Sequence, residues 1–194
     1  MSERATNTGA ARKPRADAER NRVRLMEVAK AAFTELGPDV ALEEIARRAD
    51  VGIGTLYRHF PTRDALLAEV YRHAVEQLAE AAERLSEAQA PVEALRGWMR
   101  LFVDYIATKQ VIAPALSSMV GGSSALYASS GATIKSAIAR LTDRAVANGD
   151  IKQVLEPLDL LRALVGVANV NNGPGWQTSA HTLIDVLIEG LRVR

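Results

Sequence analysis

Residues 52–59, with the sequence GIGTLYRH, contain four side chains that can donate hydrogen bonds and no carboxylate. A solvated helix face normally mixes charges of both signs, so a face of donors without an acid favours a polyanionic partner. Arg58 has the forked guanidinium that can donate two hydrogen bonds to guanine. Taken singly, Tyr57 could be a packing aromatic and His59 a surface histidine. Together, these residues predict a DNA-contacting segment.

The sequence contains few residues in patterns that are typical of enzymes. The three histidines (His59, His73 and His181) are scattered, and the chain contains no cysteine. We find no glycine-rich phosphate loop, no nucleophile elbow and no helical metal motif. We therefore expect neither catalysis nor a cofactor or metal.

Charge is distributed unevenly along the 194 residues, although the net charge is only +1. Residues 1–24 hold seven basic side chains and three acidic ones, and the remainder has an acidic excess. A basic leading end can bind DNA phosphates, but it can equally be a flexible solubilising tail. Two stretches without charge, Gln110–Ile134 and Ala163–Ala180, are interrupted by glycine, proline and polar residues, so we do not expect them to span a membrane. We expect a cytoplasmic, nucleoid-associated protein.

The elements around residues 42–60 have the lengths of a helix-turn-helix. A first helix is predicted from about Asp17 to Leu36, where Gly37-Pro38 ends it. Two short helices follow, Leu42–Ala49 and Ile53–Phe60, joined by a three-residue turn. Apolar residues at helical spacing would pack these helices together (Ile45, Ala46, Ala49, Val51, Leu56 and Phe60).

The rest of the chain is also predicted to be helical, because strand-like alternation is absent and Ala, Leu, Glu and Arg dominate. Pro61 closes the third helix, and Thr62 can cap a long fourth one. The expected later helices are about Arg63–Leu85, Pro91–Thr108, Val111–Val120, Tyr127–Asn148, Pro157–Asn172 and Trp176–Val193. The fold class is therefore all-α, with a basic arm at 1–16, a three-helix DNA-binding domain at 17–61 and a domain of about six helices at 62–194.

The run LEEIARRADVGIGTLYRHFPTRDALL, residues 42–67, resembles the DNA-binding signature of the TetR family of bacterial regulators. The resemblance implies that Thr55, Tyr57 and His59 contact the DNA backbone and that Arg63 contacts a phosphate. It places Ile53, Gly54 and Arg58 nearest the base edges.

Two positions depart from the pattern. Asp50 replaces the glycine usual in the turn, and aspartate tolerates left-handed backbone geometry. Ala41 stands where a capping Ser or Thr is common, which costs ~1 kcal/mol.

The same resemblance implies that the larger domain senses a small molecule. An aromatic-rich face and a few polar groups near the uncharged stretches are candidates for this site, although aromatic stripes at helical spacing more often belong to a core. Few charges lie there, so we expect a largely apolar or neutral ligand. The predicted ligand-binding residues are Trp98, Phe102, Tyr105, Met119, Tyr127 and Asn169.

A homodimer through the last two helices is expected, because their apolar stripes are too broad for burial against one neighbour. These stripes contain Leu158, Leu161, Leu164, Val165 and Ala168, and then Leu183, Ile184, Leu187, Ile188 and Leu191. Pro114 and Gly121-Gly122 mark a candidate moving segment. The sequence thus predicts a dimeric repressor that binds a near-palindromic operator and that a small molecule releases. A ligand-independent, nucleoid-organising DNA-binding protein is the alternative.

Overall fold

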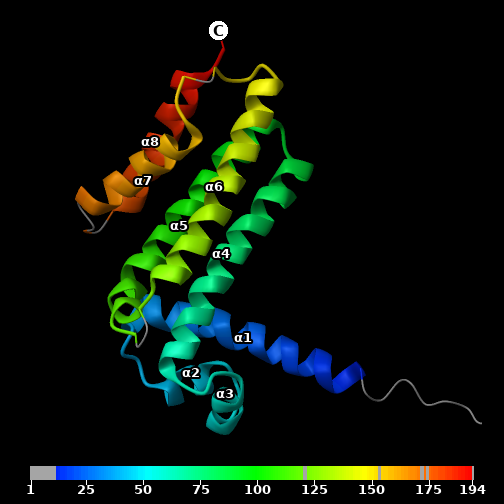
Figure 1. Cartoon of the computed structure of the whole chain (residues 1–194), viewed down its shortest axis with the longest axis vertical. Helices are drawn as coiled ribbons and strands as arrows, with labels where there is room; N and C mark the ends of the chain where they lie inside the picture. Colours follow the sequence, from blue (N-terminus) through cyan, green and yellow to red (C-terminus); the bar gives the residue numbers. More distant parts are fainter. Residues whose placement is uncertain (1–11, 120–121, 153, 171–172, 174, 194) are drawn as a thin grey trace, which may run out of the picture. The chain divides into compact units, whose positions relative to one another are not determined.

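Eight helices make up nearly all of the chain that the computed structural model describes, namely residues 12–119, 122–152, 154–170, 173 and 175–193 (Figure 1). Side chains are described from residue 18 onward. The helices are α1 (Arg12–Leu36), α2 (Leu42–Arg48), α3 (Ile53–His59), α4 (Arg63–Ala88), α5 (Pro91–Ser117), α6 (Ser124–Ala147), α7 (Pro157–Val170) and α8 (Trp176–Leu191). The predicted all-α class is confirmed.

Helix boundaries agree with the sequence-based expectation to within one residue at α2 and α3, and they differ most at α1 and α5. α1 is already helical at Arg12, five residues before the expected start, and most of the predicted arm at 1–16 lies outside the described residues. The two helices expected at 91–108 and 111–120 are one continuous helix, α5, so Pro114 falls in its last turn and not within a separate helix. Gly121, part of the expected moving segment, also lies outside the described residues.

The chain divides into two units, with the division between Val70 and Tyr71, inside α4. In the first unit, α1 packs against α2, and α2 packs against α3. The start of α4 is fixed by a side-chain cap, because the Thr62 hydroxyl accepts a hydrogen bond from the Ala65 amide at 3.0 Å. The core of this unit is aliphatic and aromatic (Leu25, Phe33, Ile45, Leu56, Phe60, Leu66 and Leu67).

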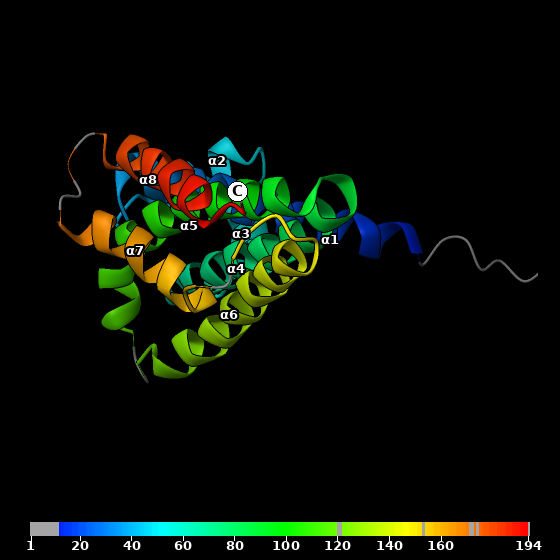
Figure 2. The same cartoon turned by 90° about the horizontal axis from the view of Figure 1, so that it is seen from above.

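In the second unit, α5 packs against α6, α7 and α8, and α7 packs against both α6 and α8 (Figures 1 and 2). The largest buried side chain, Trp98 of α5, donates its indole N–H to the Leu78 carbonyl of α4 at 2.7 Å. On the α8 side, Asp185 accepts hydrogen bonds from Arg96 at 2.5 Å and Arg100 at 3.1 Å. Burial of an aromatic core and this ion-pair cluster together hold α5 between its neighbours.

Within the described ranges, no helix is long and apolar enough to cross a membrane.

Candidate functional sites

The turn between α2 and α3 forms around Asp50, whose φ of 51° makes it the one non-glycine residue with a positive φ in the described chain. Hydrogen bonds from the Asp50 amide to the Arg47 carbonyl (3.1 Å) and from the Val51 amide to the Ala46 carbonyl (3.0 Å) close the turn. Aspartate adopts this left-handed region more readily than most residues. The substitution at the usual glycine position therefore leaves the turn intact, as the sequence predicts.

α3 presents one buried side and one open side. Leu56 is fully buried and Phe60, just after the helix, is almost so. On the other side, Tyr57 is 44% exposed and Arg58 is exposed, and neither makes a hydrogen bond or ion pair with any described side chain. α3 has no acidic residue in its first turn, and its last turn carries Arg58 and His59. Packing thus fixes the helix while leaving its donors available to an external anion.

α2 lacks a side-chain cap at Ala41, as predicted, but it has a different electrostatic stabilisation. The Glu44 carboxylate accepts hydrogen bonds from Arg47 and Arg48, each at 2.8 Å. These guanidinium groups lower the pKa of Glu44 from 4.5 to about 2. Arg48 also donates to Glu35 of α1 at 2.5 Å. The carboxylates in the first turn of α2 complement its N-terminal dipole, and the Arg48 pair connects it to α1.

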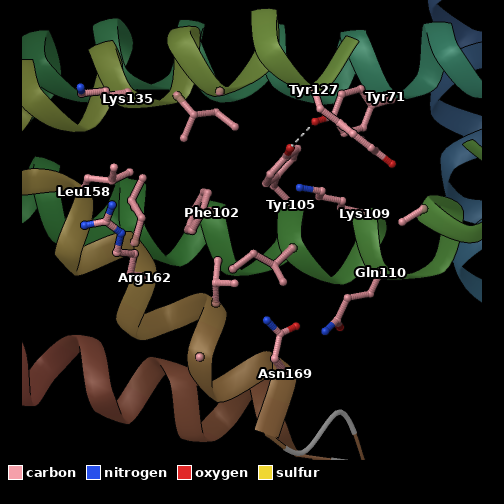
Figure 3. A pocket seen from close by; sticks show the side chains of 17 residues that line it. Tyr71, Phe102, Tyr105, Lys109, Gln110, Tyr127, Lys135, Leu158, Arg162 and Asn169 are labelled. Carbon is pink, nitrogen blue, oxygen red and sulfur yellow. Dashed lines mark hydrogen bonds between the residues drawn. The ribbon is translucent and has the colours of Figure 1, made fainter. Parts of the chain in front are cut away.

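The second unit contains a cavity of about 600 Å³ between α5, α6 and α7, with Tyr71 of α4 also in its wall (Figure 3). Each of the three helices contributes residues at helical spacing, so each turns one face toward the cavity. Gln110 ties two of the walls together, because its side-chain amide donates to the Ala168 carbonyl at 3.0 Å. The walls are Phe102, Tyr105, Ile106, Lys109, Gln110 and Ala113 from α5, Tyr127, Gly131, Ile134 and Lys135 from α6, and Leu158, Leu161, Arg162, Val165, Gly166 and Asn169 from α7.

Three tyrosines meet at one end of the cavity. The hydroxyl groups of Tyr71 and Tyr105 are 2.9 Å apart and hydrogen-bonded, and the ring of Tyr127 meets that of Tyr71 edge-on at 5.4 Å (Figure 3). Burial and the hydrogen bond to Tyr71 raise the pKa of Tyr105, so this phenol stays neutral. The hydroxyl of Tyr127 is buried, and no group in the described part of the chain is hydrogen-bonded to it. This oxygen has almost no accessible surface, so it lies within the packed wall and not on the cavity surface.

Comparison with protein families and with known proteins gives a consistent result. Residues 25–70 match the model of bacterial regulatory proteins of the tetR family, and residues 90–193 match the C-terminal domain of SbtR-like transcriptional regulators. A TetR transcriptional regulator from Streptomyces coelicolor is 40% identical, with a TM-score of 0.81 over 88% of this chain and 98% of that one. A TetR regulatory protein from Mycobacterium vanbaalenii is 32% identical, with a TM-score of 0.74 over 92% of this chain and 99% of that one.

The chain belongs to the TetR family of transcriptional regulators. An HTH-type transcriptional regulator of Staphylococcus aureus is 42% identical over 53 residues, which cover 27% of this chain and 29% of the length of that relative. Since the matched families and the similar structures are transcriptional regulators, the prediction that the chain is not an enzyme is confirmed.

Most of the residues predicted to contact DNA lie on the open side of this TetR helix-turn-helix or at its edge. Ile53, Gly54, Tyr57 and Arg58 are exposed, whereas Thr55 and His59 are half-buried. Arg63 is half-buried as well, and it donates a hydrogen bond to the Pro38 carbonyl at 2.8 Å. Arg63 therefore supports the connection between α1 and α2, and its guanidinium has further N–H groups that a phosphate could accept from.

Four of the six predicted ligand-binding residues line the cavity: Phe102, Tyr105, Tyr127 and Asn169. Trp98 does not line it, because its ring stacks on Phe102 inside the core and its one donor is used by Leu78. Met119 does not line it either, since it lies beyond the end of α5. Assignment of all six to ligand contact remains a prediction.

Sequence reasoning missed the polar half of the α5 wall, Lys109 and Gln110. An expected break between residues 108 and 111 removed both from the helix face that contains Phe102 and Tyr105. A continuous helix over 102–113 brings residues 102, 105, 106, 109, 110 and 113 onto one face, so extending the helical spacing would have found them. The α7 wall has the same spacing, at 158, 161, 162, 165, 166 and 169.

Proposed function

We propose that this TetR-family regulator is a repressor that binds a near-palindromic operator as a homodimer and that a small molecule in the α5–α7 cavity releases it. The observation that carries the proposal is the pairing, in one chain, of an acid-free exposed α3 face with a tyrosine-lined cavity of about 600 Å³. A repressor needs both features: the α3 face would bind operator DNA in the cytoplasm, and a ligand in the cavity would release the protein from that DNA.

Base recognition is assigned to Arg58, with Ile53 and Gly54 beside it. The exposed guanidinium can donate two hydrogen bonds to guanine, which is worth about 1–3 kcal/mol of discrimination. Thr55, Tyr57, His59 and Arg63 would instead contact phosphates and sugars, which position the protein without selecting sequence.

A homodimer is supported by apolar residues of α8 that the protomer leaves open. Most residues of the two apolar stripes expected on α7 and α8 pack within the protomer. Leu164, Ile184 and Ile188, for example, are fully buried. What remains is a face of α8 formed by half-buried Leu183 and Leu187, exposed Val186 and Gly190. An added Cβ at Gly190 would meet nothing within 4 Å, so a partner helix could approach closely there.

Sedimentation velocity tests the dimer. Leu187→Glu would place a charge on this α8 face, and we expect the protein to sediment as a monomer and to lose operator affinity. Leu155→Glu, which adds the same charge at an exposed leucine before α7, is the control and should remain dimeric. A dimeric Leu187→Glu protein would contradict the assignment of this face.

Selection of bound sequences from a random DNA pool, followed by titration, tests operator recognition. Arg58→Ala should flatten the preference at one base pair in each half-site and cost about 1–3 kcal/mol. Tyr57→Phe should weaken binding by a similar factor for all sequences. Arg140→Ala, an exposed arginine of α6, is the charge-matched control. An unchanged sequence profile for Arg58→Ala would contradict the assignment of base recognition.

The cavity favours this proposal over a ligand-independent nucleoid-organising protein, which needs no such space. Titration of operator DNA in the presence of small-molecule extracts separates the two. A compound that lowers operator affinity and competes with a probe bound in the cavity supports the effector-regulated repressor.

A further inference from the structure

Basic residues border the two uncharged stretches of the sequence. Lys109 precedes the first stretch, Lys135 follows it, and Arg162 precedes the second. All three line the cavity, and none of the aspartates and glutamates that the structure describes does so. The uncharged stretches form much of the wall, so the cavity is a largely apolar space with cations at its edges.

We infer that the effector is an amphipathic anion, with an aromatic or aliphatic body and a carboxylate or similar acidic group that binds the ammonium of Lys109. This inference rests on the proposed effector site and specifies the chemical class of molecule that the site takes. It replaces the expectation of a largely neutral ligand, which followed from the uncharged stretches alone and not from the residues beside them.

Of the three basic residues in the cavity wall, Lys109 is the one without a carboxylate partner among the described residues and with a partly buried charge. It is half-buried, and its ammonium lies 5.0 Å from the centre of the Tyr127 ring. Among the described residues, no carboxylate pairs with it. Burial lowers the pKa of Lys109, because the charged form loses solvation. A bound anion would supply the missing counter-charge, and a desolvated ion pair of this kind is stronger than one on the surface.

Aromatic groups surround Lys109. Tyr127 offers it a ring face and not its hydroxyl, whose oxygen has almost no accessible surface. Figure 3 shows Lys109, Tyr105 and Tyr127 together at one end of the cavity, and Asn169 and Gln110 on its lower side. The ammonium of Lys109 therefore defines where the acidic head of the ligand binds.

At the opposite end the basic residues are already compensated or solvated. Arg162 donates to Asp159 at 2.7 Å, and Lys135 is exposed. Both also line a neighbouring hollow that contains Asp143 and Glu156. The apolar body of the ligand would therefore extend from Lys109 toward this end, along Phe102, Ile106, Ile134, Leu161 and Val165.

Two fluorescent probes with the same ring system test the inference. 8-Anilinonaphthalene-1-sulfonate is an amphipathic anion, and N-phenyl-1-naphthylamine is the same body without the sulfonate. In titrations of the full-length protein, we expect the anion to bind at least ~10-fold more tightly, the factor typical of a hydrogen bond to a charged group. Gly131→Leu, which fills the cavity from the α6 wall, should weaken both probes and so show that they bind there.

Lys109→Met tests the assigned cation. It should weaken the sulfonate probe ~10-fold or more and change the neutral probe less than twofold, whereas Lys109→Arg should keep the preference for the anion. Lys152→Met, an exposed lysine outside the cavity, is the charge-matched control and should change neither probe.

The outcomes separate the two proposals. If the wild-type protein binds both probes equally in the cavity, or if Lys109→Met weakens both to the same extent, the anionic ligand is excluded and the effector site stands. If neither probe responds to Gly131→Leu, the cavity does not bind amphipathic molecules, and the proposed effector site and the anionic ligand both fail.

Discussion

Filling the cavity at Gly131 should stabilise the protein and abolish effector binding together. Gly131 lies inside α6, on the same face as Tyr127 and Ile134, and an added Cβ there would meet nothing within 4 Å. Glycine in a helix interior costs about 0.5–1 kcal/mol relative to alanine, and leucine has nearly the same helix propensity as alanine. Gly131→Leu also buries about half of a leucine side chain. Its transfer from water to the cavity adds about 1 kcal/mol to the free energy of unfolding.

Gly131→Leu should therefore raise the free energy of unfolding by about 2 kcal/mol, which corresponds to about 4–8 °C in Tm for a chain of this size. Gly131→Ala should raise it by about half as much and leave the cavity open. Thermal unfolding without ligand measures the first effect, and probe titration measures the second. The reasoning would be refuted if Gly131→Leu melted below Gly131→Ala, because the leucine would then meet atoms and not open space. It would also be refuted if the leucine variant bound probe like the wild type.

Three further predictions concern the helix-turn-helix. Asp50→Gly should raise the free energy of unfolding by about 0.5–1 kcal/mol in denaturant titrations, because glycine adopts a φ of 51° without strain; a loss of stability would mean that the aspartate side chain itself holds the turn. Ala41→Ser should add about 1 kcal/mol by capping α2, where no side-chain cap exists, and Ala41→Val is the uncapped control. The lowered pKa of Glu44 contributes stability above pH 4.5 that is lost as the pH falls to about 2, so Glu44→Gln should show a shallower loss of stability in that range.

The helix-turn-helix could be predicted from sequence because its determinants are local. Gly37-Pro38 ends α1, Pro61 separates α3 from α4, and Thr62 caps the next helix within a few residues of each boundary. Interactions between neighbours in sequence also determine which side of α3 is buried, since Leu56 and Phe60 are one turn apart. The positions that should face DNA follow from these local rules together with the absence of acids.

The α5 wall of the cavity could not be predicted in the same way, because tertiary packing determines it. Residues 108–112 contain Thr108, Val111 and Ile112, whose branched side chains are weak helix formers, so local propensity favours a break there. In the structure Ile112 is buried and Gln110 donates to the Ala168 carbonyl of α7, and these contacts keep the helix continuous. The position of Lys109 in the cavity wall thus depends on α7, which is some fifty residues away in the chain.

α4 links the helix-turn-helix to the cavity along the chain. It begins at Arg63, directly after α3, and its Tyr71 lines the cavity. A ligand can change operator affinity only by preferring one arrangement of this element over another. A tenfold change requires a difference of about 1.4 kcal/mol, which is close to the net value of a single buried hydrogen bond. The free energy of the Tyr71–Tyr105 hydrogen bond is of the size that such a difference requires. An anion at Lys109 would act on this hydrogen bond through Tyr127, since the Tyr127 ring contacts both the lysine and Tyr71 of α4.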